Sequence, residues 1–453
     1  MSEPTEVSKG VFNAWFQCMN GCSTRHALTE IIYKCPECDS LLEVVHDMEA
    51  LKTRSATDWK RLFEERYRKN DWPYGSSVWG KKELVCPVVD NENIVSTYEG
   101  ASNLFWAERL GNELGMKDLW VKQCGMSHTG SFKDLGMTVL VSMVKQMRSE
   151  GQNIKAVACA STGDTSAALA AYCAVADIPA IVFLPKGKVS LTQLIQPIAH
   201  GVLTLSLDTD FDGCMKVVQQ ISAGNEIYLA NSMNSLRIEG QKTISFELVQ
   251  QFDWEVPDVV IVPGGNLGNV SAIGRGFKMW YDLGIINKLP RLVCAQAERA
   301  NPLARCFKTN YEKFEPVQAQ TTQASAIQIG NPVSVMKAIR ALKEFDGVVE
   351  DATENELSNA VGRANRTGLL CCPHTGVALA ALEKLVKRGV IKKNERVVVI
   401  STANGLKFTD FLANYHGERI KDVKTEFPFN EINLPPDIDV IRKTISEKLE
   451  RRN

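Results

Sequence analysis

The sequence predicts an α/β fold in which two lobes, each built on a doubly wound parallel sheet, follow a small cysteine-bearing segment. Three observations predict it. Short runs rich in Val, Ile and Ala recur along residues 119–415, longer segments of helical period separate them, and four cysteines lie within the first fifty residues. Buried strands that alternate with helices are typical of parallel sheets. The large number of expected strands favours two lobes.

The expected elements follow one another in a regular order. Strands are expected at DLWVKQC, AVACA, AIVFLP, VLTLSL, VVIVPGG, RLVCAQ and RVVVIST. Helices are expected after Lys133, at TSAALAAYCAVA, at VSLTQLIQPIAHG, and around Met215 and Ile273. Ligands of such sheets bind where strands end and helices begin, and the unusual residues of this chain lie there.

Composition divides the 453-residue chain into four segments. Residues 1–50 hold four of the cysteines, and residues 51–118 form a helical segment that begins with the charged stretch TDWKRLFEERYRKN. Residues 119–415 form the catalytic α/β lobes, and residues 416–453 form a C-terminal extension. With 44% hydrophobic residues the chain can bury a large core.

Charge and hydropathy exclude several classes of protein. A net charge of −1 argues against nucleic acid or an anionic membrane as the main partner. No apolar run is long enough to cross a bilayer, and the N-terminus carries neither a secretory nor an Arg-rich targeting pattern. Thirteen cysteines without a secretory context argue against a disulfide framework. We therefore expect a cytoplasmic protein.

Lys133 lies in the segment SHTGSFKD, just inside an expected helix start. An arbitrary lysine usually lies at the surface. Here small residues allow close approach to the backbone, while Phe132 and Leu135 can desolvate the amine. Desolvation lowers the pKa of a lysine and makes it a better nucleophile toward an aldehyde.

The segment PGGNLGN follows the strand VVIV and precedes a helix. Its glycines free backbone N–H groups to surround a phosphate, and the helix start adds about 0.3–1 kcal/mol for an anion. The alternative is an ordinary tight turn. Because it matches neither a P-loop nor the dinucleotide pattern, it favours a different phosphate-bearing cofactor. Its residues are Gly264, Gly265, Asn266, Leu267, Gly268 and Asn269.

Three further segments offer polar groups at strand ends. In ASTGDTSAA the hydroxyl residues Ser161, Thr162 and Thr165 suit a carboxylate, or else Thr162 or Asp164 simply caps the helix. Arg237 could clamp a second phosphate, or else pair with Glu239 or face solvent. Thr402 in STANGLKF could bind a ring nitrogen, or else cap the strand end.

These five motifs in this order resemble the fold-type II pyridoxal-phosphate-dependent family, and within it the plant-type threonine synthases. The resemblance covers residues 71–408, including RIEGQKT, ASAIQIG and CPHTGVAL. It implies pyridoxal 5'-phosphate as cofactor, a homodimer, and a lyase that converts O-phospho-L-homoserine and water to L-threonine and phosphate. The reaction would be a γ-elimination followed by water addition at the β carbon.

The resemblance also implies roles for single residues. Lys133 would carry the cofactor as a Schiff base and move protons, residues 264–269 would hold the cofactor phosphate, and Thr402 would face the pyridine nitrogen. The substrate carboxylate would lie at Ser161, Thr162 and Thr165, and the substrate phosphate at Asn231, Ser232 and Arg237, with Lys188 a weaker candidate. Asp164 stands where many relatives have Asn beside the cofactor, and Asn404 where plant enzymes usually have His.

The N-terminal cysteines resemble the two knuckles of a zinc ribbon, which some other threonine synthases keep. Cys18 and Cys22 form one pair, and Cys35 and Cys38 the other. Four thiolates suit tetrahedral zinc, and such a site can contribute about 10–16 kcal/mol of binding free energy. The alternative is a degenerate ribbon with free cysteines.

Two competing functions and one effector stay open at this stage. A serine/threonine dehydratase-like lyase would have no use for Arg237, because its substrates lack a γ-phosphate. A zinc-ribbon binding protein with an inactive synthase-like body would not need Lys133. Residues 72–83 resemble the region with which plant enzymes bind S-adenosylmethionine, through Trp72, Tyr74 and Trp79, although interface packing explains these aromatic residues as well.

Overall fold

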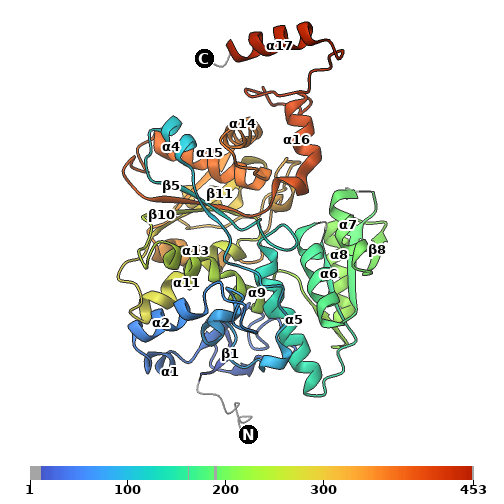
Figure 1. Ribbon diagram of the computed structural model, residues 1–453. Coiled ribbons are helices and arrows are strands. Elements are labelled where there is room, and N and C mark those ends of the chain that lie inside the picture. The colour runs from blue at the N-terminus through green and yellow to red at the C-terminus, as the bar shows by residue number, and fades with distance from the viewer. Residues whose placement is uncertain (1–11, 162, 188–190, 451–453) are drawn as a thin grey trace, which may run out of the picture.

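The computed structural model describes residues 12–161, 163–187 and 191–450, and it contains three sheets (Figure 1). Two are the predicted parallel sheets, one in each lobe, and the third is a small antiparallel sheet near the N-terminus. The predicted fold class is therefore confirmed. The runs AIVFLP and AVACA form the strands β7 (Ala180–Pro185) and β6 (Ala156–Ala160), as expected.

The large sheet has six strands in the order β12-β11-β10-β13-β5-β4. All neighbouring strands run parallel except β4, which pairs antiparallel with β5 at the edge of the sheet. Strand β4 comes from the segment before residue 119. Helices α14 and α15 cover one face, and α11 and α13 cover the other (Figure 1). The strands are β4 (Leu104–Trp106), β5 (Leu119–Gln123), β10 (Val259–Pro263), β11 (Arg291–Ala297), β12 (Val348–Ala352) and β13 (Val397–Ser401).

Capping residues in the sequence explain where two helices around this sheet begin or end. Helix α14 begins with a capping box in which Thr353 and Glu356 satisfy each other's backbone N–H groups. Helix α4 ends at Gly115, whose φ of 72° is left-handed. The helices are α4 (Glu108–Leu114), α10 (Thr243–Gln251), α11 (Gly268–Asp282), α12 (Pro302–Lys308), α13 (Val335–Glu344), α14 (Glu354–Asn365), α15 (Pro373–Lys387) and α16 (Thr409–His416).

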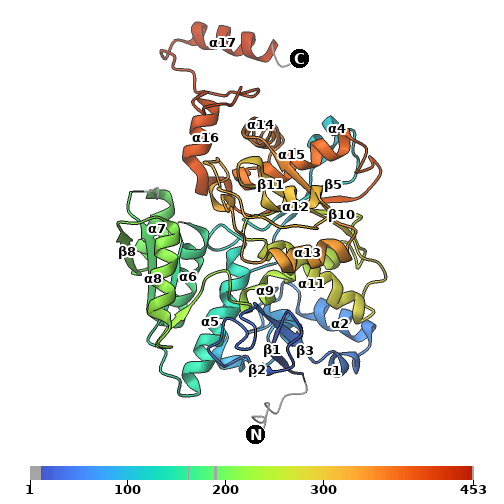
Figure 2. The same ribbon diagram turned by 180° about the vertical axis from the view of Figure 1, so that it is seen from behind.

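The small sheet is parallel throughout, in the order β8-β7-β6-β9. Helix α5 packs on both α6 of this lobe and α9 below the large sheet, so it lies between the lobes (Figures 1 and 2). The remaining elements here are α5 (Lys133–Ser149), α6 (Asp164–Ala176), α7 (Leu191–Ala199), β8 (Leu203–Leu207), α8 (Phe211–Ser222), β9 (Ile227–Leu229) and α9 (Leu236–Gln241).

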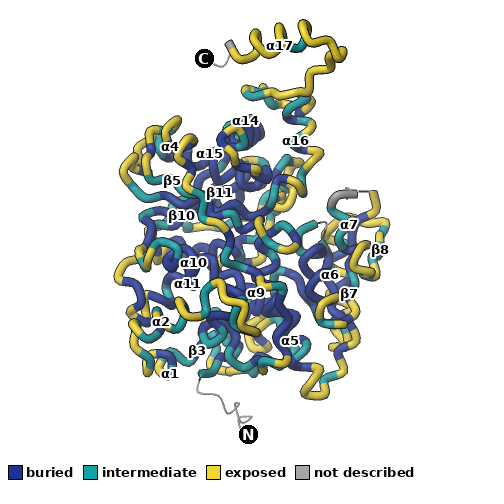
Figure 3. Tube along the Cα trace, in the orientation of Figure 1, coloured by how far each residue is buried: buried dark blue, intermediate teal, exposed yellow. Residues whose placement is uncertain are grey.

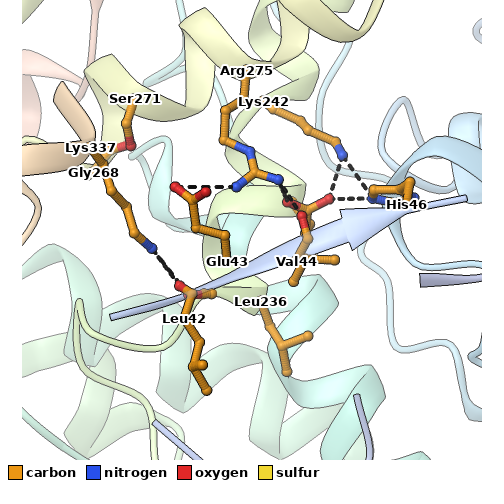
Figure 4. A network of polar contacts seen from close by, with 12 residues as sticks. Leu42, Glu43, Val44, His46, Leu236, Lys242, Gly268, Ser271, Arg275 and Lys337 are labelled. Carbon is orange, nitrogen blue, oxygen red and sulfur yellow. Dashed lines mark hydrogen bonds and ion pairs between the residues drawn. The ribbon is translucent and has the colours of Figure 1, made fainter. Parts of the chain in front are cut away.

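The N-terminal sheet consists of β1 (Ala14–Cys18), β2 (Arg25–Ala27) and β3 (Leu42–His46), followed by α1 (Met48–Lys52), α2 (Ala56–Arg66) and α3 (Lys82–Val85). It lies against α9 and α11 (Figure 2). Strand β3 is held there by side chains of α11 and α13 (Figure 4). Lys337 Nζ donates to Leu42 O at 2.6 Å, and Arg275 donates to Val44 O.

One apolar cluster runs through both lobes and a further cluster lies in each lobe, whereas the C-terminal end leaves the body (Figure 3). Helix α17 (Ile438–Glu450) is mostly exposed, and apolar Ile438 and Ile445 face solvent. No helix in the described part of the chain is long and apolar enough to span a membrane. Single turns complete the chain at η1 (Trp79–Lys81), η2 (Asn91–Asn93), η3 (Glu298–Ala300), η4 (Ser325–Ile327) and η5 (Gly405–Phe408).

Candidate active site

Lys133 opens helix α5 directly beside the segment that follows β13. Phe132 N donates to Thr402 O at 2.9 Å, and Asn404 N donates to Gly130 O at 2.9 Å. Between these bonds Ser131 and Ala403 form an antiparallel bridge. Backbone pairing therefore places Thr402 next to the lysine, as the motifs predict, although the two segments are far apart in the chain.

The turn before Lys133 is held by a buried carboxylate. Asp134 accepts hydrogen bonds from Thr129 N at 2.9 Å and from Thr129 Oγ1 at 2.5 Å. The Lys133 ammonium lies 3.9 Å from the centre of the Phe132 ring. Burial, and then the nearby positive charge of Arg237, lower the pKa of Lys133 to about 7. The residue as a whole is half-buried, while its amine lies deep enough to be desolvated. These are the properties expected of a reactive lysine.

The glycine loop after β10 forms a close backbone cradle. A Cβ at Gly264 would lie 2.4 Å from Cys294 Sγ, and one at Gly265 would lie 2.9 Å from a side-chain atom of Ile327. Leu267 has the left-handed φ of 67° and is followed by the first turn of α11. Both amide atoms of Asn269 are buried and have no partner among the described residues. Unpartnered donors at a helix start fit a bound phosphate.

Arg237 on α9 brings a second positive charge to the site. It is only 3% exposed. It donates to Ala230 O at 3.1 Å and to Thr165 Oγ1 at 3.4 Å, while its Nε has no partner among the described residues. Burial lowers the pKa of the guanidinium to about 10. Neither alternative from the sequence holds, because Arg237 does not face solvent and Glu239 pairs with His46 and Lys242 instead.

Arg237 reaches the site because α5 and α9 pack with almost no space between their backbones. A Cβ at Gly240 would lie 1.6 Å from Leu135 O, so no other residue fits there. A Cβ at Gly136 would lie 2.9 Å from Arg237 O. The RIEGQKT motif thus places an arginine against the helix that begins with Lys133.

Other predicted substrate residues lie here with their side chains engaged. Ser161 Oγ accepts from Gly163 N and Ser166 N, each at 3.3 Å, which is a helix cap. Asn231 exchanges two hydrogen bonds with the backbone of Ala160, at 3.0 and 2.8 Å. Ser232 Oγ accepts from Asn266 Nδ2 at 3.3 Å, which ties it to the glycine loop. The roles of these residues in binding stay predictions.

Two of the remaining candidates, Thr162 and Lys188, lie outside the described residues. Thr165 accepts from Arg237, as above, and Asn404 Oδ1 caps the turn η5 by accepting from Leu406 N at 2.9 Å. Asp164 turns to Lys407, whose Nζ lies 3.1 Å from Asp164 Oδ1.

The sequence reasoning missed two residues of this site, Lys407 and Cys372. The thiol of Cys372 lies 3.9 Å from Thr402 Oγ1 and 3.2 Å from Thr375 Oγ1. Burial raises the pKa of this thiol, but His374 and then Thr375 outweigh burial and bring it to about 7. Both residues lie in motifs of the family resemblance, GLKF and CPHTG. The sequence did not indicate which residues they contact, and so gave no reason to place them in the site.

Comparison with known proteins agrees with this geometry. The family model "Pyridoxal-phosphate dependent enzyme" matches residues 95–403. The chain is 58% identical over 400 residues to "Threonine synthase 2, chloroplastic" of Arabidopsis thaliana, covering 88% of this chain and 77% of that protein. The chain belongs to the threonine synthase family of pyridoxal-phosphate-dependent enzymes. A threonine synthase of Methanocaldococcus jannaschii is 40% identical, over 88% of this chain and 95% of that one.

Solved structures show the same fold at lower identity. The threonine synthase of Escherichia coli matches with a TM-score of 0.66 at 18% identity, over 96% of this chain and 99% of that chain. Threonine deaminase isoform 2 of Solanum lycopersicum matches with a TM-score of 0.57 at 19% identity, over 68% and 86%. At such identities the likeness concerns the fold alone.

Pyridoxal phosphate, the cofactor of this family, fits the residues described above. The unpartnered amide of Asn269 and the cradle at Gly264 and Gly265 suit its phosphate. Lys133 is the amine that can hold its aldehyde carbon, and the buried hydroxyl of Thr402 is available to its ring. A hydroxyl there, unlike a carboxylate, would leave the ring nitrogen largely unprotonated.

The four N-terminal cysteines come together as the ribbon pattern predicts. Their sulfur atoms all lie within 4.8 Å of one another, with Cys18 and Cys38 at 3.4 Å and Cys22 and Cys38 at 3.6 Å. Zinc–sulfur bonds of about 2.3 Å in a tetrahedron place sulfurs roughly 3.8 Å apart. The cluster could therefore hold a zinc ion.

The aromatic segment is divided between core and surface. Trp79 is fully buried and donates through Nε1 to Thr138 Oγ1 at 2.7 Å, so it packs on α5. Trp72 is 51% exposed, and the Tyr74 ring lies 4.1 Å from the guanidinium carbon of Arg66. Of the three rings, only Trp72 and Tyr74 remain accessible to an effector.

Proposed function

We propose that this chain is a threonine synthase that converts O-phospho-L-homoserine and water to L-threonine and phosphate. The observation that carries this within the family is Arg237. Its guanidinium is buried, has no carboxylate partner among the described residues, and keeps an unpartnered Nε beside Lys133. A buried cation without a counter-charge is costly, and a substrate phosphate would supply the missing charge.

The residues of the chain divide the work of this reaction. When bound, pyridoxal phosphate acts as an electron sink that makes the α and β protons of the substrate removable. Lys133 Nζ takes up the α proton and then a β proton near neutral pH, because its pKa is about 7. Phosphate leaves the γ carbon toward Arg237 with the bonding electron pair, and hydroxide from water adds at the β carbon. Of the α proton, the β proton and the remaining proton of water, one returns to the γ carbon, one returns to the α carbon from Lys133 Nζ, and one leaves with phosphate.

The other polar residues orient the substrate in this proposal. Ser161 and Thr165 stand at the start of α6, where a carboxylate is favoured by the helix dipole, and we place the substrate carboxylate there with Thr162. We assign the substrate phosphate to Arg237 together with Asn231 and Ser232, and Lys188 is the weaker candidate. Residues 264–269 hold the cofactor phosphate.

The deciding assay measures threonine and phosphate from O-phosphohomoserine, with L-serine and L-threonine as control substrates. Equal amounts of threonine and phosphate would support the synthase. Ammonia and a keto acid from the controls, with no turnover of the phosphorylated substrate, would assign the chain to the dehydratases.

We also propose that Cys18, Cys22, Cys35 and Cys38 hold one structural zinc ion. The sulfur distances support it, and so does the turn in which Asp39 N donates to Cys35 O at 2.9 Å. Metal analysis of the purified protein should give one zinc per chain, and Cys35→Ser should reduce it at least tenfold. A zinc-free protein with four reactive thiols would favour the degenerate ribbon.

The homodimer, the S-adenosylmethionine effector and the cytoplasmic location stay predictions. Light scattering of the purified protein tests the first. Activity with and without S-adenosylmethionine, in the native chain and in Trp72→Ala, tests the second. The third needs localisation of the tagged full chain, because the Arabidopsis relative is named as chloroplastic.

A further inference from the structure

One ion pair joins the two lobes directly beside Lys133. Asp164 opens α6 of the small-sheet lobe, and Lys407 lies in η5, after the last strand of the large sheet. Lys407 Nζ lies 3.1 Å from Asp164 Oδ1, and the two side chains are 11% and 9% exposed. The same ammonium donates to Thr129 O at 2.8 Å, in the turn that carries Lys133.

We propose that Asp164 and Lys407 are positioning residues whose ion pair closes the small-sheet lobe onto the lysine turn and balances the charge beside Lys133. The inference rests on the proposed function and deepens it. It also gives Asp164 a role that differs from that of the asparagine in many relatives, because its carboxylate pairs with a cation of the other lobe.

The charges around Lys133 support this role. Three charged groups influence the amine from three elements: Arg237 on α9 and Lys407 in η5 lower its pKa, and Asp164 on α6 raises it. Asp134, the next residue on α5, is occupied by Thr129. The effects of Lys407 and Asp164 have opposite signs, so the intact pair acts on Lys133 nearly as a neutral group.

The contacts of Lys407 make the pair specific to this position. A Cβ at Gly130 would lie 3.0 Å from Lys407 Cδ, so the lysine stem fills the space that the glycine leaves open. The ammonium thus touches the turn on one side and the small-sheet lobe on the other. A salt bridge held by packing at both ends loses less side-chain entropy than an exposed one.

The test is a pH titration of the visible absorbance of the lysine-bound cofactor in the holoenzyme. Lys407→Met leaves the Asp164 carboxylate unbalanced, so the midpoint should rise by about one pH unit. Asp164→Asn leaves the Lys407 ammonium unbalanced, so the midpoint should fall by a similar amount. The double variant should titrate close to the native chain, and Lys407→Arg, which keeps the charge, should shift it little.

The outcomes separate this inference from the proposed function. A native protein without a visible cofactor band would overturn the proposed function. A band that shifts in the same direction in both single variants, or in neither, would overturn the ion-pair inference and leave the cofactor in place. If Lys407→Met fails to fold, Asp164→Asn, which keeps the size of the side chain, decides alone: a midpoint that does not fall would overturn the inference.

Discussion

Two buried groups of charges lie on either side of α9, and they differ in whether their charges are matched. On one side, the cations Lys133 and Arg237 have no ion-pair partner among the described residues. On the other side, each carboxylate of the network that fastens the N-terminal sheet is paired with at least two basic side chains (Figure 4). Its ion pairs join Glu43 and Glu239 to His46, Lys242, Arg275 and Arg340, and Lys337 adds the hydrogen bond to Leu42 O.

The distances within the network show the matching. His46 Nε2 lies 2.7 Å from Glu239 Oε2, and Lys242 pairs with the same oxygen. Arg275 reaches Glu43 and Glu239, each at 3.7 Å. Burial alone would raise the pKa of Glu239, yet Lys242 and then His46 hold it at about 2. Paired buried charges hold two parts of the structure together, whereas buried cations without a carboxylate partner form a binding site for an anion.

Loss of the reactive amine should have the largest effect. Lys133→Ala should lower kcat by at least about 10⁴-fold, because the base and the cofactor link are both removed. It should also remove the lysine-dependent absorbance band. The unfolding free energy should not fall, since an unmatched buried cation is lost. Lys313→Ala, at a lysine that is 75% exposed, serves as the control in rate, spectrum and urea unfolding. A Lys133→Ala protein with native turnover would exclude the mechanism.

Loss of the central acid of the network should act on stability instead. Glu239→Gln should lower the unfolding free energy by about 3–5 kcal/mol, because Lys242 would remain buried without its partner. Urea unfolding of the cofactor-bound protein measures this. The control is Glu49→Gln, whose carboxylate is 85% exposed and pairs with Lys52, with an expected change below about 0.5 kcal/mol. Equal effects of the two substitutions would show that the network is not matched as described.

Removal of Arg237, the second cation of the active site, should act on KM. Arg237→Met should raise the KM for O-phosphohomoserine by about 10–100-fold, since one charge-assisted contact is lost, at about 1.5–3 kcal/mol. Stability should hold or increase, in contrast to Glu239→Gln. Arg61→Met, at an arginine that is 69% exposed, is the matched control in the steady-state assay. An unchanged KM would place the substrate phosphate elsewhere.

The same contrast explains what the sequence could predict. The strands, Lys133 and the glycine loop were predictable because each signal lies within a few consecutive residues, as in PGGNLGN. The partners of Asp164 and Glu239 were not, because Lys407 and His46 come from distant elements that only tertiary packing brings together. Arg237 lies near Lys133, and its role stays a prediction. From the sequence, a pairing of Arg237 with Glu239 was an equally good interpretation, because only the direction of each side chain on α9 separates the two.

Acid should weaken the matched network gradually, and this is the smallest effect we expect. The pKa of Glu239 is about 2 in the folded protein, below its ordinary value of 4.5, so its stabilisation is complete above pH 4.5 and is lost as pH falls toward 2. Burial and then Lys242 lower the pKa of His46 from 6.5 to about 4, so uptake of its proton by the unfolded chain adds destabilisation between pH 6.5 and 4.

Each group contributes a slope of at most about 1.4 kcal/mol per pH unit to the unfolding free energy. Urea unfolding at several pH values should therefore show Glu239→Gln losing less stability than the native chain between pH 4.5 and 3. Because the substitution removes the titrating carboxylate, the two stability curves should converge as the pH falls. Curves that stay parallel would mean that Glu239 titrates normally, and the matched network would then hold the N-terminal sheet by packing and not by charge.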